Sequence, residues 1–392
     1  MGILHAYSPS RITSALKSST VPSTSGLPAN PTYYKIDNVR KAENATLFFT
    51  RDPENNHVVM KILNNYKDIR YSLETAEKRQ RCQLDALRWN KKFTKDVYLG
   101  LAQVADPKER KLICAGEILE DPTLEELEPG AEYALLMKEL PRGRRLDTLL
   151  RRDNILSSKY YASVLARYMA AIHRIDDKDE KVVPGAGGRG KWGSVEQLRE
   201  KLQHNFAFVD SPPTDDKAIL QSVAFKALRD FNGVLKARLL PVFAEDKYQK
   251  YFDGRVNEGR IRRCHGDLKA RNIWIMPYEA QRNEQPWERV KALDAVDFNP
   301  MYSTIDILSD FAMLVVDVDV RSNAEVANSM LEDYLHLTNQ KSVLARFVLN
   351  YYIVEKAFIG AIVNILYDEK PDLGLAYLRV AERRLEDVKL GK

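Results

Sequence analysis

A polar loop that leads into a short apolar strand carries the residues best suited to chemistry. His265, Asp267 and Asn272 follow the pattern H-x-D-x-x-x-x-N, and apolar residues occupy 273–275. A carboxylate at the start of such a loop can accept the proton of an attacking hydroxyl, and the later amide oxygen can bind a metal ion. The same residue types also occur in loops that make only turn hydrogen bonds. The spacing therefore indicates phosphoryl transfer, with a purely structural loop as the alternative.

Two carboxylates follow a second apolar strand, predicted at residues 290–293. Asp294 comes directly after this strand and Asp297 follows shortly after. Mg²⁺ that binds phosphates prefers hard oxygen ligands, commonly one or two carboxylates. A hairpin that brings Asn272 close to Asp294 or Asp297 would supply these ligands. The alternative interpretation is a solvated turn.

Two further acids lie on a helix predicted at residues 304–318. Asp306 and Asp310 are four residues apart, so they share one face of the helix, where like charges are unfavourable unless they are compensated. Ser303 and Asp306 have the spacing of a capping box, although Asp replaces the usual Glu or Gln. Because apolar residues surround Asp310, we expect it to bind backbone amides of the loop that contains Asp267.

A lysine lies on a strand predicted at residues 57–63 in the first half of the chain. Alternation places Val58, Met60 and Ile62 on one face of the strand and Lys61 on the other. In a cleft, Lys61 could neutralise the α- and β-phosphates of a nucleotide, whereas on its own it would be an ordinary solvated lysine. The preceding loop, residues 50–56, contains no glycine, so we expect magnesium and Lys61 to hold phosphates more than backbone amides do.

The elements that must position these residues divide the chain. Extended segments are predicted at 45–51, 57–63, 97–104, 111–119 and 133–137, with one helix at 74–93. Helices then predominate, at 159–175, 194–206, 217–243, 304–318, 342–366 and 373–388. Residues 1–32 are serine-rich and free of acids, which predicts a disordered tail, with a transit peptide as the alternative. We expect an α+β protein with a small β-rich lobe over 33–140, a helical lobe over 141–392 and a cleft between them.

The composition limits the classes of partner. The chain has 392 residues, 60 Lys and Arg against 55 Asp and Glu, and a net charge of +5. This small excess does not favour nucleic acid or a membrane surface as a partner. Three cysteines are too few for a disulfide framework and indicate a reducing compartment, so a cytoplasmic protein is expected. The apolar stretch 351–367 contains Glu355 and Lys356 and is shorter than the about 20 residues of a membrane span, so it predicts a buried helix.

Two other patterns have competing interpretations. Residues 185–191 satisfy G-x-x-x-x-G-K, but no strand precedes them and Trp192 occupies the position of the magnesium-binding Ser or Thr. We interpret them as a mobile glycine loop beside the acceptor pocket, before a helix capped by Ser194. Basic residues are concentrated at 142–152 and 255–271. They form a solvated basic face or, alternatively, bind an anionic or phosphorylated acceptor. His173 is expected to be a hydrogen-bonded packing residue, and Cys264 a small buried neighbour of His265.

The motifs resemble the aminoglycoside phosphotransferase-like branch of the protein-kinase-like fold, whose core reads HGD-x-x-x-x-N, then D-F, then D-x-x-x-D-apolar-A. More specifically, the chain resembles the bacterial "aminoglycoside phosphotransferase family enzyme" group from about residue 34 to the C-terminus. The further matching segments are YSLE at 71–74, LRWNKK at 87–92, DVYLG at 96–100, KWGS at 191–194, RIRRCHGD at 260–267 and DFN at 297–299. Members of this group are often fused to a P-loop kinase domain. The resemblance implies a bilobal protein-kinase-like fold with nucleotide bound by the small lobe.

The resemblance also implies a role for particular residues. Asp267 would be the catalytic base, Asn272 a magnesium ligand, and Asp297 or Asp294 the second metal carboxylate. Asp297 is slightly favoured because it lies in a Val-Asp-Phe segment 13 residues before Asp310. The remaining implied positions are the nucleotide-binding residues Lys61, Asp85, Met137 and Glu139 and the loop-supporting residues His265 and Asp310. Asp85 stands where a longer Glu is usual, so its ion pair with Lys61 is an open point.

The sequence thus predicts a small-molecule kinase that uses ATP or GTP and Mg²⁺ to phosphorylate a hydroxyl of a small molecule. Its mechanism would rest on positioning and charge neutralisation. The competing hypothesis is a pseudokinase-like binding or scaffold module that does not turn over. The glycine-free loop and Asp85 favour that hypothesis, whereas the set formed by Asp267, Asn272 and Asp297 or Asp294 opposes it.

Overall fold

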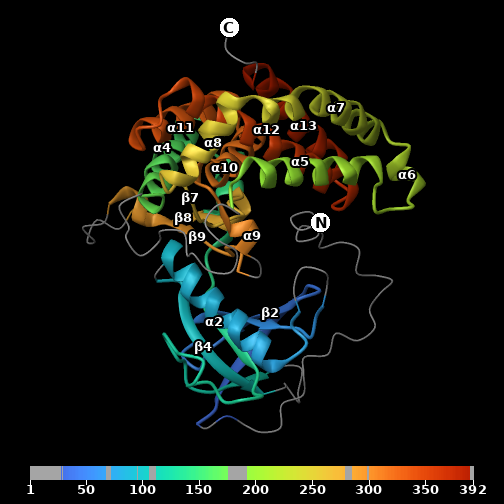
Figure 1. Cartoon of the computed structure of the whole chain (residues 1–392). Helices are drawn as coiled ribbons and strands as arrows, with labels where there is room; N and C mark the ends of the chain where they lie inside the picture. Colours follow the sequence, from blue (N-terminus) through green and yellow to red (C-terminus); the bar gives the residue numbers. More distant parts are fainter. Residues whose placement is uncertain are drawn as a thin grey trace. The chain divides into compact units, whose positions relative to one another are not determined.

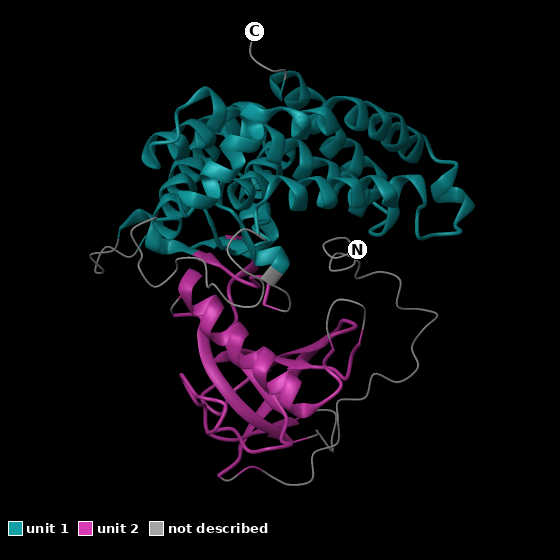
Figure 2. Cartoon of the chain, viewed as in Figure 1, with its two compact units in different colours: residues 1–11, 145–290, 300–392 teal, residues 12–144, 291–299 magenta. Residues whose placement is uncertain are grey.

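The computed structural model describes residue 28 and residues 30–67, 72–94, 96–105, 112–174, 192–278, 285–297 and 300–388. These residues form two compact units (Figure 2). The smaller unit contains the described residues up to 144 together with 291–297, and the larger contains those of 145–290 and 300–388. Residues 1–27 and 29 of the predicted disordered tail (1–32) and the glycine-rich segment 185–191 lie outside the described residues, whereas Thr32, at the end of the predicted tail, belongs to a strand.

The smaller unit is built around a closed antiparallel barrel. Its strands follow the order β1-β2-β3-β6-β4-β5. They are β1 (Thr32–Lys41), β2 (Ala45–Arg51), β3 (His57–Leu63), β4 (Tyr98–Ala105), β5 (Leu112–Ala115) and β6 (Tyr133–Lys138). Val58, Met60 and Ile62 belong to the buried core cluster of the barrel, as the alternation predicted. β1 was not predicted, and it closes the barrel because it pairs with both β2 and β5.

One helix, α2 (Ala76–Phe93), packs against β4 and β6 of this unit. Thr75 caps the helix by accepting a hydrogen bond from the amide of Lys78. Gln83, buried on α2, donates from Nε2 to the carbonyl of Lys61 at 2.8 Å. The helix therefore fixes the backbone of the strand that carries Lys61.

The larger unit is mainly helical (Figure 1). Its helices are α3 (Leu146–Arg152), α4 (Ile155–Ile172), α5 (Val195–Asp210), α6 (Lys217–Leu220), α7 (Val223–Leu239), α8 (Asp246–Asn257), α9 (Pro300–Ser303), α10 (Ile307–Arg321), α11 (Ala324–Leu337), α12 (Val343–Leu366) and α13 (Pro371–Leu385). Short strands pair as β7 (Ile261–Arg263) with β10 (Thr304–Asp306) and β8 (Ile273–Ile275) with β9 (Val290–Ala292). A β-rich N-terminal part and a mostly helical C-terminal part confirm the predicted α+β class.

Two predicted helices differ from the observed ones. The predicted helix at 217–243 is divided, because Ser222 caps a new helix by accepting a hydrogen bond from the amide of Phe225. The helix predicted from residue 304 begins at Ile307, since residues 304–306 form β10 and pair with β7. Asp306, rather than Ser303, caps α10. The expectation that Ser303 and Asp306 form a capping box was therefore wrong.

Helix α12 is the core helix of the larger unit and packs against α10 and α13. It runs for 24 residues, which makes it longer than the predicted apolar stretch and long enough to cross a membrane. However, 89% of its apolar window is buried inside the protein. This burial confirms the prediction of a buried helix, which buries its apolar surface against neighbouring helices.

The contact between α12 and α13 depends on a glycine. A Cβ added to Gly360 would lie 2.5 Å from Cδ1 of Tyr377, whereas one added to Gly233 on α7 meets nothing within 4 Å. We expect Gly360→Ala to lower the free energy of unfolding by about 1–3 kcal/mol through overpacking. Gly233→Ala should instead raise it by up to about 1 kcal/mol through helix propensity. Urea unfolding followed by far-UV circular dichroism measures both, and a neutral or stabilising Gly360→Ala would contradict this packing.

Candidate active site

The loop between β7 and β8 holds the carboxylate of Asp267 in a defined position. The Nδ2 group of Asn272 donates to the Asp267 carbonyl at 3.0 Å and to its Oδ2 at 3.1 Å. The Nζ of Lys269 lies 2.9 Å from Oδ1 of Asp267. Gly266 has a φ of 80°, a left-handed conformation that glycine adopts without strain. The loop thus places an amide and an ammonium around one carboxylate, and Lys269 is a contact that the sequence reasoning missed.

Asp310, in the first turn of α10, binds the beginning of this loop. Its carboxylate accepts hydrogen bonds from the amides of His265 at 3.3 Å and Gly266 at 2.8 Å. The side chain is almost completely buried. Burial opposes ionisation, but the hydrogen bond and charge of His173 together with the loop hold the pKa of Asp310 below its ordinary value. Asp310 is therefore an ionised anchor for the residues that precede Asp267.

A second buried acid on α10, Asp317, binds the end of the loop. Its Oδ2 accepts a hydrogen bond from the amide of Ala270 at 2.7 Å and lies 3.2 Å from Nε of Arg321. The hydroxyl of Tyr377 donates to its Oδ1. Burial opposes ionisation here too, but Arg321 and these hydrogen bonds lower the pKa of Asp317. Asp317 was not predicted, and its signal is a second aspartate seven residues after Asp310 in an apolar helix.

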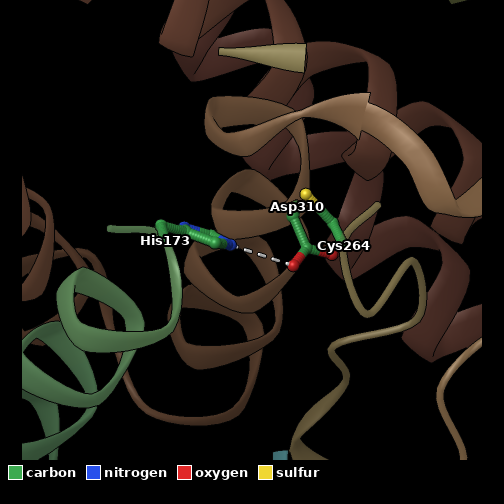
Figure 3. A group of neighbouring side chains, drawn as sticks. All are labelled: His173, Cys264 and Asp310. Carbon is green, nitrogen blue, oxygen red and sulfur yellow. Dashed lines mark hydrogen bonds and ion pairs between the residues drawn. The ribbon is translucent and has the colours of Figure 1, made fainter. Parts of the chain in front are cut away.

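His173, Cys264 and Asp310 form a buried cluster beside the loop (Figure 3). Their potential ligand atoms lie within 4.8 Å of one another. Nδ1 of His173 lies 2.9 Å from the hydroxyl of Tyr334, and Nε2 lies 3.2 Å from Oδ2 of Asp310. Because both ring nitrogens are engaged, we interpret the cluster as support for Asp310 and not as a metal site. The prediction that His173 is a hydrogen-bonded packing residue is confirmed.

In the smaller unit, Lys61 lies between two carboxylates. Its Nζ is 3.4 Å from Oδ1 of Asp294 and 3.9 Å from Oδ2 of Asp297. Burial disfavours the charged form of Lys61, but Asp297 and Asp294 outweigh this effect and raise its pKa above the ordinary value. Burial raises the pKa of Asp297, and Lys61 opposes that shift. The two acids differ in exposure, since the side chain of Asp294 is 68% exposed and that of Asp297 is 12% exposed.

The turn after β9 carries both acids and is bound to other residues of the smaller unit. Asp294 has a φ of 63°, the left-handed conformation that Asp tolerates better than most residues. Its amide donates to the hydroxyl of Tyr98 at 3.1 Å, and the amide of Ala295 donates to Oδ1 of Asn90 at 2.9 Å. Lys291 is held in the same unit by an ion pair with Asp96 at 2.8 Å. The barrel and α2 therefore fix the segment that carries both acids.

The other residues implied for nucleotide binding lie on the same unit. Asp85 is half-buried on α2, and in the described part of the chain the ion-pair partners of Lys61 are Asp294 and Asp297. Met137 pairs in register with Val59 and Tyr98. Oε2 of Glu139 lies 3.3 Å from Nδ1 of His57. The structure thus groups Lys61 with Asp294 and Asp297, and separately groups Asp267 with Asn272, His265 and Asp310.

The basic run at 255–271 is not a simple solvated face. Arg255 is buried and paired with Asp306, with 2.6 Å between Nη2 and Oδ1. Arg262 is also buried and donates to the carbonyl of Gly259 at 3.1 Å. In the second run, Arg145 is bound to Asp147 at 2.6 Å. The interpretation of these runs as a solvated face is therefore wrong for Arg255 and Arg262, whose charges are used within the fold.

Comparisons with known proteins find likenesses in structure. No protein-family model matches the chain, and no curated protein matches its sequence significantly. A choline kinase from Cryptosporidium parvum aligns at 11% identity over 91% of this chain and 89% of its own, with a TM-score of 0.47. A GDP complex of an aminoglycoside 2'-phosphotransferase IIIa mutant aligns at 9% identity over 90% and 93%, with a TM-score of 0.47. An ADP-bound aminoglycoside phosphotransferase aligns at 13% identity over 91% and 96%, with a TM-score of 0.41. Aminoglycoside phosphotransferases, which the sequence motifs resemble, are thus among the similar structures.

The anchoring of the loop by Asp317 can be tested through stability. Asp317→Ala would leave Arg321, the Ala270 amide and the Tyr377 hydroxyl without their buried acceptor. We expect a loss of about 3–5 kcal/mol in the free energy of unfolding, measured by urea denaturation. The matched control is Glu325→Ala, which breaks the exposed ion pair with Lys159 and should change stability by less than about 1 kcal/mol. Similar losses in the two variants would show that Asp317 does not anchor the loop.

Proposed function

We propose that the protein is a magnesium-dependent phosphotransferase that transfers the γ-phosphate of ATP or GTP to a hydroxyl of a small molecule. The observation that carries the proposal is the carboxylate of Asp267, held by Asn272 and Lys269 in a loop that α10 anchors at both ends. Phosphoryl transfer needs positioned groups more than a covalent catalyst. A carboxylate held in this way suits a base that orients the acceptor hydroxyl and takes its proton.

In this mechanism Lys269 and Lys61 supply positive charge, whereas Asp267 accepts the proton. Lys269 is close enough to Asp267 to fix its carboxylate, and its ammonium can stabilise negative charge on the phosphoryl group that is transferred. Lys61 is held charged by Asp297 and Asp294 and can neutralise the other phosphates of the nucleotide. Charge neutralisation and orientation thus come from residues that are already fixed before the substrates bind.

The residues present fit a magnesium ion. In the described structure the side-chain nitrogen of Asn272 is used by Asp267, so its amide oxygen is the atom left for a metal. Asp294 is exposed and lies two residues after the end of β9, whereas Asp297 is largely buried against Lys61. Exposure therefore favours Asp294 as the metal carboxylate, although the spacing in the sequence slightly favoured Asp297. When bound, Mg²⁺ would neutralise charge on the β- and γ-phosphates.

A nucleotide-binding module without turnover is the second candidate, and the turn between β2 and β3 favours it. In this glycine-free turn the amide of Asn55 donates to the carbonyl of Asp52 at 2.9 Å, and the amide of Asn56 donates to the Asp52 carboxylate at 2.8 Å. These amides are used inside the turn instead of being presented to phosphates. Weak phosphate binding by this turn would suit a protein that binds a nucleotide without transferring its phosphate.

Asp267→Asn separates the two candidates. It keeps the shape of the side chain but removes the group that accepts the hydroxyl proton, so turnover should fall by roughly 10²- to 10⁴-fold. Nucleotide affinity should change little, because Asp267 acts on the acceptor. An assay of ADP or GDP release with a panel of hydroxyl compounds measures turnover, and calorimetry measures affinity. A wild-type protein with no transfer to any acceptor or to water, indistinguishable from Asp267→Asn, would support the binding module.

The assignment of the metal carboxylate predicts different effects for Asp294→Asn and Asp297→Asn. ATP with magnesium at 100-fold above its Kd should stabilise the wild type by about 2.7 kcal/mol, and ATP with EDTA should stabilise it less. Asp294→Asn should lose this dependence on magnesium. Asp297→Asn should keep the dependence on magnesium but weaken the ion pairing that positions Lys61. Thermal-shift measurements test this, and equal shifts with magnesium and EDTA in the wild type would contradict the metal site.

A further inference from the structure

The larger unit contains a cavity that reaches the catalytic loop at Gly266, the residue before Asp267. The cavity has a volume of about 640 Å³, which is within the usual range for small-molecule sites. Residues of α5, β10 and α12 line it together with Gly266. Its walls include the apolar side chains of Trp192, Ile305 and Ile359. A compound that occupied this cavity would therefore lie beside the loop that carries the proposed base.

The charged groups that line the cavity are mostly neutralised by other protein groups. On α12, Oε2 of Glu355 lies 3.3 Å from Nζ of Lys356, and both side chains are largely buried. Asp306 is paired with the buried Arg255. Glu196 and Glu200 are exposed residues of α5, where water screens their charge. The lysines that line the cavity are Lys201 of α5 and Lys356. Lys356 is paired with Glu355, which leaves Lys201 as the lysine whose charge could attract a ligand.

The ammonium of Lys201 binds a backbone carbonyl. Its Nζ donates to the carbonyl of Met301 at 3.2 Å. Among the described residues, no carboxylate lies within ion-pair distance of this ammonium. Burial and the neighbouring Lys356 lower the pKa of Lys201 to about 8, with Glu355 opposing the shift. An ammonium that is desolvated and faces a second lysine is stabilised by an anion from outside the chain.

We propose that the acceptor is a small hydroxylated anion, such as a hydroxycarboxylic acid, whose acidic group is bound by Lys201 inside this cavity. The proposal rests on the proposed function, because it names the substrate class of that site. The apolar wall accommodates the carbon skeleton of the acceptor. Of the carboxylates that line the cavity, Glu355 and Asp306 are neutralised by Lys356 and Arg255, and Glu196 and Glu200 are exposed to water. The charge in the buried part of the cavity therefore favours an anion.

Three probes of one carbon skeleton test this directly. Gluconate, sorbitol and 1-amino-1-deoxysorbitol carry an acidic, a neutral and a basic end group on similar polyol chains. Calorimetry without nucleotide should show at least tenfold tighter binding of gluconate than of the other two. Gluconate should also slow acetylation of Lys201 by acetic anhydride, as measured by mass spectrometry. Equal affinities for the three probes would overturn the proposal, and so would the absence of binding by all three.

Variants identify the residue responsible. Lys201→Gln should reduce gluconate affinity at least tenfold, Lys201→Arg should retain most of it, and Lys226→Gln, at an exposed position on α7, should leave it unchanged. Gluconate binding that is unchanged in Lys201→Gln would overturn the proposal. Binding without nucleotide does not require catalysis, so Lys201-dependent binding without phosphoryl transfer would count against the proposed function alone. Transfer to neutral or cationic acceptors alone would count against the anionic acceptor.

Discussion

The loop that carries Asp267 depends on two buried carboxylates of one helix. Asp310 and Asp317 are seven residues apart, close to two helical turns, so α10 presents both on one face. Asp310 binds the amides of His265 and Gly266, and Asp317 binds the amide of Ala270. Hydrogen bonds to charged acceptors are stronger than those to neutral ones. A loop held at both ends in this way can keep the intervening Asp267 carboxylate in place without a ligand.

Both carboxylates are in turn fixed by side chains from distant helices of the same unit. His173 at the end of α4 and Tyr334 of α11 form a chain of hydrogen bonds to Asp310. Tyr377 of α13 donates to Asp317, and its ring packs over Gly360 of α12. The apolar packing of α12 and α13 therefore determines where Tyr377 lies, and Tyr377 helps to determine where the loop lies. Stability of the helical core and geometry of the site are thus coupled.

Much of the fold and of the candidate site could be predicted from the sequence, because residue patterns within short segments determine it. Alternation in β3 placed Lys61 opposite Val58, Met60 and Ile62, and the apolar surroundings of Asp310 indicated a buried acid that binds loop amides. What was missed depends on tertiary partners. β1 is largely exposed, and its pairing with β5 closes the barrel only in three dimensions. Asp317 has Asp319 and Arg321 as polar neighbours in the sequence, but its partners Ala270 and Tyr377 are distant in sequence. Helix α11, in contrast, has an apolar stripe that could have been recognised.

Burial decides the roles of the charged groups more clearly than residue type does. Arg255 and Lys201 are both basic residues of the larger unit, yet Arg255 has its counterion Asp306 within the fold, whereas among the described residues the partner of the Lys201 ammonium is a backbone carbonyl. The same contrast separates Asp297, buried beside Lys61, from Asp294, which is exposed next to the same lysine. A buried charge that the chain itself neutralises stabilises a structure, whereas one that it leaves without a counterion, or exposes on a fixed turn, can bind a ligand. By this criterion, Lys201 and Asp294 are the positions that we propose for binding a substrate and a metal.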